Sequence, residues 1–215
     1  MTQPRHSSPH VTNTYTFSAA STNGIANDVA YSGGGFALTA AGATDGCAHP
    51  ITILGNAATN HAAKTFTITG TDANGVAITN GIAGPNGVAT VTSTKRFKTV
   101  TSVTVDSTTG ADTFDIGWTA LASTPWVTLN TRACPFAVGV GAVLVSGSAN
   151  YDLEHTYDEI DTNVTAQVAY NNATMAAKTA SFDVGLTYPV KAVRLDVNSH
   201  TSGVMRFTVL QGTPA

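Results

Sequence analysis

The stretch 64–105 restricts the fold of this chain more than any other part of the sequence. On both sides of the loop 71–75, apolar residues alternate with polar ones, namely Phe66, Ile68, Val76 and Ile78. Alternation around a loop that ends in Asn74-Gly75 is typical of a β-hairpin, because Asn and Gly tolerate the positive φ that such a loop needs. We therefore predict a turn at Asn74 and Gly75, with the four apolar side chains facing a core.

The end of the same stretch carries an irregular apolar spacing. The intervals are three, three and two residues between Phe97, Val100, Val103 and Val105. A regular strand would place Val100 on the wrong face, since side chains alternate with a period of two. We predict a β-bulge or one tight turn within residues 98–101.

The composition extends this prediction to the whole chain. Charged residues make up 11% of the 215 residues, whereas an average soluble protein has about 25%. The chain is rich in Thr and holds 20 glycines; Thr is stiff at χ1, and Gly costs a helix about 1 kcal/mol. No convincing amphipathic helix is present, so the sequence favours short strands joined by turns.

Turn signals recur along the chain about every 8–12 residues, a spacing typical of sandwiches and barrels. We expect an all-β protein with two consecutive β-sandwich domains, Ig-like or jelly-roll-like, at residues 14–120 and 121–215. Residues 1–13 are polar, contain two prolines and show no periodicity. We expect them to form an N-terminal arm.

The second domain contains several segments that read as strands. We predict strands at 126–129, 136–145 and 149–156, with a turn at 146–148 between the last two. The chain then ends in a predicted hairpin whose loop is 198–203. Its inward face would consist of Val193, Leu195, Val197, Met205, Phe207 and Val209.

Charge and hydropathy restrict the partners. The formal net charge of −3 provides no electrostatic footprint for nucleic acid, and no apolar run approaches the roughly 18–20 residues of a membrane span. The first ten residues contain no hydrophobic segment of the signal-peptide type. We therefore expect a protein made and assembled in a host cytoplasm that later works outside, as virion components do. The alternative is an extracellular protein whose signal has been removed.

Two parts of the stretch 64–105, at 68–75 and 93–103, resemble a β-domain that recurs in structural proteins of tailed bacteriophages. That pattern has a TGTDANG hairpin followed by a TSTKxFKTVTSV strand. The second half of the chain is also similar to a phage virion module, at 123–127, 135–139, 151–158 and 189–195. Together the likeness covers most of residues 28–212.

The resemblance implies a non-enzymatic virion structural protein with no catalytic residues and no cofactor. The first expectation is a protein that decorates or stabilises the capsid as a decoration, cement or head-fibre protein, with a collar or tail component second. Its partners would be the major capsid protein or neck and tail proteins, and we expect a homo-oligomer, first of all a trimer. A receptor- or carbohydrate-binding adhesin module is the alternative from another class.

The arm has one candidate role. Arg5, His6 and His10 give it a weak positive character, and a polar segment can become ordered on a neighbouring subunit. We expect either a tether to a particle neighbour or a frayed tail.

A dense acidic cluster is the main candidate for chemistry. Asp152, Glu154 and Asp158 offer oxygen ligands of the kind that Ca²⁺ prefers, although the spacing lacks the DxDxDG pattern. A glycosidase carboxylate pair is a weaker interpretation. The six histidines show no zinc-binding spacing and no GxSxG motif is present, so we expect no metal site and no enzyme.

Two further sets of residues remain. Aromatic side chains can stack on sugars, but we expect most of them to anchor the cores: Trp118, Trp126, Tyr151, Tyr157 and Tyr170. Cys47 and Cys134 show no metal-ligand spacing, and we expect buried thiols, with a disulfide as the open alternative.

Overall fold

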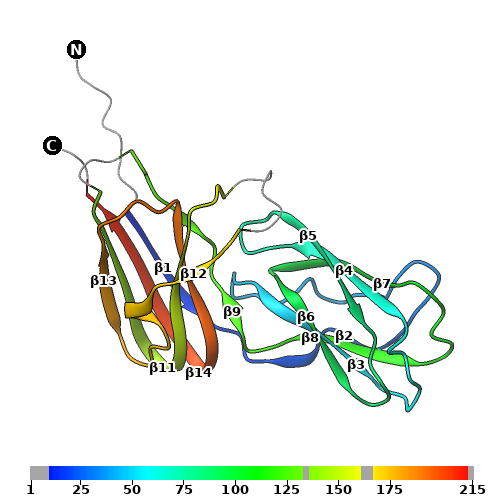
Figure 1. Cartoon of the computed structure of the whole chain (residues 1–215). Helices are drawn as coiled ribbons and strands as arrows, with labels where there is room; N and C mark the ends of the chain where they lie inside the picture. The colour runs from blue at the N-terminus through cyan, green and yellow to red at the C-terminus, as the bar shows by residue number, and fades with distance from the viewer. Residues whose placement is uncertain (1–9, 133–135, 161–166, 213–215) are drawn as a thin grey trace. The chain divides into compact units, whose positions relative to one another are not determined.

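The computed structural model describes residues 10–132, 136–160 and 167–212 (Figure 1). The fold is all-β with antiparallel sheets, as predicted, and its described residues include a single helical turn, η1 at Ala173–Met175. Among them, no helix has the length and hydrophobicity that crossing a membrane requires. The chain forms two compact units. We call Phe17–Pro125 the inserted unit, and Met1–Thr16 with Trp126–Ala215 the split unit.

The inserted unit contains two sheets. The first has four strands in the order β2-β8-β3-β6, and the second has three in the order β5-β4-β7. The short β9 (Ala122–Ser123) follows them. The bounds are β2 Ser21–Ala30, β3 His49–Gly55, β4 Thr65–Thr71, β5 Ala77–Ala83, β6 Thr90–Phe97, β7 Thr99–Val105 and β8 Thr113–Trp118.

Both sheets contribute apolar side chains to one core, as in a β-sandwich. Three phenylalanine rings meet there: Phe66 of β4, Phe114 of β8 and Phe36 of the loop after β2. Their ring centroids lie 5.2–5.7 Å apart, which is the usual spacing of favourable aromatic pairs. The alternation of apolar residues seen in the sequence therefore builds this core.

The predicted hairpin turn between β4 and β5 is confirmed. Gly75 has a φ of +86°, which Gly adopts without strain. The Asp72 carboxylate accepts hydrogen bonds from the N–H groups of Asn74 and Val76, both at 2.9 Å, and fixes the loop. Of the four apolar residues expected to face inward, Phe66 and Ile68 are fully buried, whereas Val76, just before β5, and Ile78 within it are half-buried.

The predicted irregularity near residues 98–101 is also confirmed. The chain bends at Lys98 between β6 and β7, and the β4–β7 register shifts by one residue between Thr69 and Gly70. The shift leaves Thr101 as the extra residue, since Ser102 pairs with Thr69 and Val100 pairs with Gly70. The bulge allows Phe97, Val100, Val103 and Val105 all to be buried.

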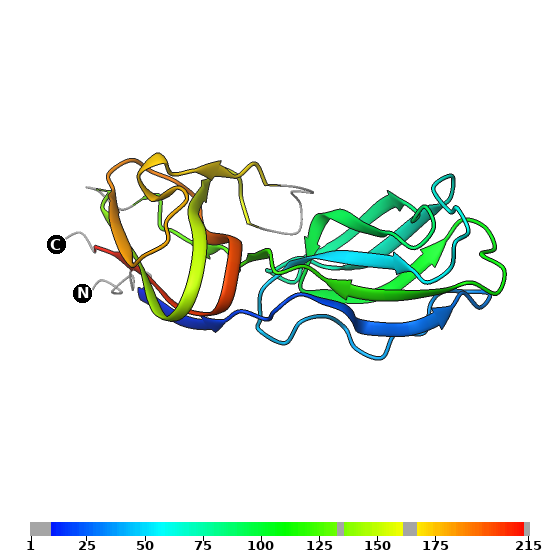
Figure 2. The same ribbon diagram turned by 90° about the horizontal axis from the view of Figure 1, so that it is seen from below.

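The split unit is built around two long paired strands, β11 (Val138–Thr156) and β14 (Ala192–Gln211). The first half of β11 pairs with β13 (Phe182–Leu186), and its end pairs with β12 (Tyr170–Asn171). The start of β14 pairs with β10 (Val127–Thr128), and its second half pairs with β1 (His10–Thr16). Figure 2 shows the two long strands bending together.

This bend corrects two predictions. Residues 146–148 and 198–203 were expected to be reversing turns, but the chain continues through both as strand, so no terminal hairpin forms. The turn-forming residues instead produce bulges where the long ribbon bends, with Gly147 at φ +71° and Ser202 at φ +46°. Two adjacent strands bent at the same place keep pairing with each other, which two separate turns would prevent.

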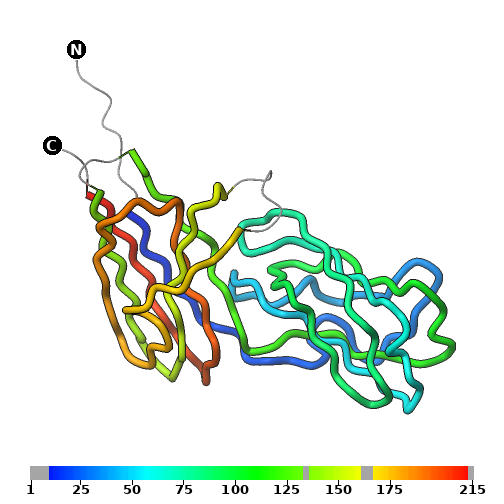
Figure 3. The backbone as a smooth tube through the Cα atoms, in the orientation of Figure 1, coloured from blue at the N-terminus to red at the C-terminus, as the bar shows by residue number. Residues whose placement is uncertain are grey.

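The N-terminal prediction is wrong for residues 10–13. They belong to β1, where His10 pairs with Leu210 and Asn13 with Phe207. In Figure 3 the blue β1 runs beside the red end of the chain. The expected domain limits of 14–120 and 121–215 change for the same reason, because a strand at each end of the sequence completes the split unit. Arg5 and His6 lie outside the described residues.

A buried polar network holds the loop before β3. The side chains of Asp45 and His49 are each 1% exposed and lie 2.9 Å apart, from carboxylate oxygen to Nε2. The same carboxylate accepts hydrogen bonds from the N–H groups of Ser18 and Cys47. Cys47 is a buried free thiol, as expected, and its burial raises its pKa; Cys134 lies outside the described residues.

Candidate functional site

Three tyrosines with exposed rings surround one buried histidine in the split unit. Tyr157, Tyr170 and Tyr188 are 52%, 47% and 40% exposed, whereas His155 is only 7% exposed. We call these four residues the tyrosine cluster. Large aromatic side chains usually bury their rings, so three exposed rings at one place mark this surface as a candidate binding site.

The geometry of the cluster centres on the imidazole ring. Tyr170 stacks on His155 with ring centroids 5.7 Å apart and an interplanar angle of 27°. Tyr157 and Tyr188 approach the same ring edge-on, at 5.5 and 5.8 Å. Tyr157 also meets Tyr170 at 5.6 Å and 61°. The exposed rings of Tyr157 and Tyr170 are therefore inclined to each other.

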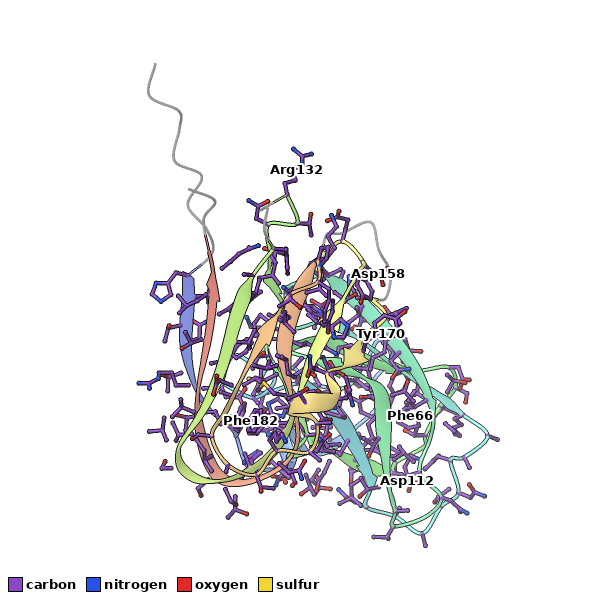
Figure 4. All side chains as sticks on the ribbon, turned by 60° about the vertical axis from the view of Figure 1, so that its left-hand side comes forward. Phe66, Asp112, Arg132, Asp158, Tyr170 and Phe182 are labelled. Atoms are coloured by element: carbon purple, nitrogen blue, oxygen red, sulfur yellow. The ribbon has the colours of Figure 1, made fainter. Side chains whose placement is uncertain are left out.

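Three separate segments bring these side chains together. His155 lies near the end of β11, directly opposite Tyr170 of β12 in the ladder. The chain turns after β11, where the N–H of Asp158 donates to the Thr156 hydroxyl at 3.1 Å, and Tyr157 lies within this turn. Tyr188 precedes Pro189 in the connection to β14. Figure 4 labels Tyr170 and Asp158 at this end of the unit.

His155 shares the inward face of β11 with Tyr151 and Leu153, because side chains two apart on a strand point the same way. Its burial lowers its pKa, which favours the neutral imidazole at pH 7. The ring nitrogen Nδ1 is buried and forms no hydrogen bond with any described residue. A buried polar atom without a partner is uncommon in proteins.

The acidic residues proposed for calcium each have other partners. The Asp152 carboxylate accepts a hydrogen bond from Asn198 Nδ2 at 2.9 Å, and Glu154 accepts one from Arg194 Nε at 2.7 Å. Asp158 accepts one from the N–H of Val168 at 2.7 Å. Within the described ranges, no group of three or more His, Cys, Asp or Glu side chains is placed to hold a metal ion.

Beside the tyrosine cluster, the charges are mostly paired. Glu159 forms an ion pair with Lys191. Arg194, already bound to Glu154, also lies 4.3 Å from the ring centroid of Trp126. The carboxylate of Asp158 is the acidic group here whose described partner is a backbone N–H and not a cation.

The expectation that most aromatic residues anchor the cores holds for some of them and fails for others. Tyr151 is fully buried and Trp126 nearly so, and the indole of half-buried Trp118 donates to the Ala19 carbonyl at 2.9 Å. The expectation is wrong for Tyr157 and Tyr170, which are exposed. Tyr188 was not singled out, and its only local signal is the adjacent Pro189.

A second surface feature lies on the outer face of the split unit. Gly139 and Gly141 of β11 and Gly185 of β13 form a floor without side chains, which we call the glycine floor; Gly139 pairs with Gly185 in the ladder. The hollow above it is also lined by Asp183 and Leu210. None of the three glycines has a positive φ between +20° and +160°.

No known family model matches this chain, and neither a curated protein nor a solved structure does.

Proposed function

We propose that the chain is a non-enzymatic structural protein of a tailed-bacteriophage virion that decorates or stabilises the capsid. A collar or tail position is the second location. The observation that supports the proposal is that the two segments that resemble phage structural proteins, 68–75 and 93–103, meet at one place in the fold.

The contact between the halves is close and specific. The hydroxyls of Thr71 and Thr99 lie 2.6 Å apart, and the N–H of Lys98 donates to the Thr71 carbonyl at 2.8 Å. A Cβ added to Gly70 would lie 1.9 Å from the Thr99 carbonyl oxygen. Gly70 in the first half therefore permits the bulge in the second half, and each half needs the other.

A chain rich in Thr and Gly can match another such chain through composition alone. Here the shared residues form the turn at Gly75 and the bulge opposite Gly70, so the likeness lies in residues that determine the module. We propose on this ground that the resemblance reflects a common module.

The proposed role needs interface area and no turnover. With charged residues at 11%, the surface offers Thr, Ala and Val for contacts with neighbouring subunits. We propose a homo-oligomer, with a trimer as the first candidate, assembled with the major capsid protein or with neck and tail proteins. Light scattering at micromolar concentration tests the oligomer, and a species of only 22.0 kDa would count against self-association in solution.

The experiment that tests the proposal is a count of copies on purified particles, by quantitative mass spectrometry together with cryo-electron microscopy. Hundreds of copies on the head would support capsid decoration. A handful at one vertex would move the protein to the collar or tail. Absence from particles would overturn the virion proposal.

A further inference from the structure

We infer that the tyrosine cluster is a carbohydrate-binding site for a neutral sugar. This goes beyond a structural role on a particle and does not depend on it. The site consists of the exposed side chains of Tyr157, Tyr170 and Tyr188, which pack around the buried His155.

The ring geometry suits a pyranose. The face of an aromatic ring carries partial negative charge, and the C–H groups on one face of a sugar carry partial positive charge, so the two stack. Tyr157 and Tyr170 are inclined at 61° with centroids 5.6 Å apart. Two inclined rings can contact a sugar on two of its sides, and tyrosine hydroxyls can form hydrogen bonds with its hydroxyls.

The buried histidine provides a second, independent indication. His155 is 7% exposed and its Nδ1 has no hydrogen-bond partner among the described residues. Leaving a buried polar atom without a partner costs about 1–3 kcal/mol. Because Nδ1 is itself covered, a sugar hydroxyl reaches it only when one of the tyrosine rings packed on the imidazole turns aside. Such a hydroxyl would then meet this unfilled requirement, which a wholly apolar ligand cannot.

The size of the cluster favours a small ligand over a protein partner. Its three tyrosine rings lie around a single imidazole, with centroid distances of 5.5–5.8 Å from it. A stable protein–protein interface needs about 800 Å² on each partner, which is several times the area of a few rings. The cluster matches the area of one or two sugar rings.

The nearby charge selects among sugars. Glu159 is paired with Lys191, while Asp158 keeps a carboxylate bound only to a backbone N–H among the described residues. This leaves excess negative charge beside the rings, which repels acidic sugars. The site is therefore expected to bind neutral hexoses and their oligosaccharides in preference to sialic or uronic acids.

The test uses the purified full chain and four probes: galactose, glucose, N-acetylglucosamine and, as the acidic control, N-acetylneuraminic acid. Saturation-transfer NMR and calorimetry measure binding. We expect at least one neutral probe to bind with millimolar affinity and the acidic probe to bind more weakly. Replacing one aromatic contact, Tyr170→Ala, should weaken the affinity by about tenfold.

The matched control is Phe182→Ala. Phe182 is also an exposed aromatic residue of the split unit, 37% exposed and beside Lys178, but it lies outside the cluster. The Phe182→Ala substitution should leave the affinity for the sugar unchanged. His155→Phe keeps a ring and removes the polar nitrogens. It should reduce the affinity for the sugar, while the NMR signals of the tyrosines remain those of a folded protein.

Three results would overturn the inference: no binding of any neutral probe at tens of millimolar, equal binding by the wild type and the Tyr170→Ala variant, or blockage of the cluster by a protein partner without any sugar binding. All of them leave the particle-counting test unaffected, because that test does not involve sugar.

Discussion

The inserted and split units use glycine for opposite reasons. In the inserted unit, a Cβ on Gly70 or Gly117 would lie 1.9 Å from a backbone carbonyl oxygen, that of Thr99 or Ser21. In the split unit, a Cβ on Gly141 or Gly185 would meet no atom of the described residues within 4 Å. The first pair is required by the packing of the backbone, and the second pair is not.

This difference separates what builds the fold from what shapes the surface. A glycine inside a strand costs about 0.5–1 kcal/mol relative to alanine. At Gly70 the close approach of β7 accounts for that cost. At the glycine floor no close contact with the described part of the split unit does, and such glycines often mark a place where another backbone or a ligand approaches.

The chain offers a way to follow each unit separately, because it has two tryptophans, with Trp118 in the inserted unit and Trp126 in the split unit. Replacing Trp126 with Phe leaves a fluorescent reporter for the inserted unit. Replacing Trp118 with Phe leaves one for the split unit. The following predictions are for denaturant unfolding measured in these two backgrounds.

The largest effect is expected for Gly70→Ala. Since the added Cβ would collide with backbone, which cannot move as a side chain can, the variant should lose about 3 kcal/mol or more of unfolding free energy. The Trp118 reporter should show the loss and the Trp126 reporter should not. A loss below about 1 kcal/mol would contradict the claim that the backbone packing of the inserted unit requires glycine at position 70.

The next largest effect is on the stability of the inserted unit at low pH, through the buried carboxylate of Asp45. Burial works against the charge on Asp45, but hydrogen bonds from His49 and from the N–H groups of Ser18 and Cys47 outweigh it, so the pKa of Asp45 is lowered. A carboxylate with a lowered folded-state pKa stabilises the protein above its unfolded pKa of about 4, and the stabilisation is lost as the pH falls further.

Asp45→Asn should therefore destabilise the inserted unit by about 2 kcal/mol at pH 7 and flatten the decline of stability below about pH 4. Unfolding curves of the Trp118 reporter from pH 7 to pH 2 check both effects. An unchanged acid limb in the variant would show that another carboxylate controls it.

Gly75→Val should cost somewhat more than 1 kcal/mol, because a β-branched residue resists the φ of +86° at this turn. There is open space around the Cβ position, so the cost is one of backbone conformation alone. Gly75→Asn is the control and should cost much less, since Asn tolerates positive φ. Equal melting temperatures for the wild type and the Gly75→Val variant would rule out a conformational cost at this turn.

The smallest effect, of opposite sign, is expected at the glycine floor. Gly141→Ala should leave the split unit unchanged or stabilise it by about 0.5 kcal/mol, because alanine restricts the unfolded chain and its Cβ has room. The Trp126 reporter measures this. A loss of more than 1 kcal/mol would mean that this glycine, like Gly70, is needed for packing.

The sequence predicted the inserted unit better than the split unit for a physical reason. The turn at Gly75 arises from residues close together in the chain. The bulge near Thr101 is part of the long-range pairing of β4 with β7, but the irregular apolar spacing that predicted it lies within residues 97–105. The bend at Gly147 uses the same turn-forming residues, but the outcome depends on whether β14 stays paired with β11. That pairing is long-range, and local signals do not encode it.

The candidate site was predictable only in part. Tyr157 and Tyr170 were recognised as residues that could stack on sugars, but aromatic residues are mostly buried, and this general rule favoured the core. Their exposure depends on β12 pairing with the last residues of β11. Tyr188 comes from a third segment, so no local pattern connects it to the other two.

The order of the strands also has a consequence for biosynthesis. A ribosome releases β1 well before its partner β14, because the whole inserted unit lies between them in the sequence. The inserted unit can therefore fold while β1 is still without its partner in the same chain. On a crowded polysome, the unpaired β1 can pair with the β14 of a neighbouring nascent chain, which gives a domain-swapped dimer.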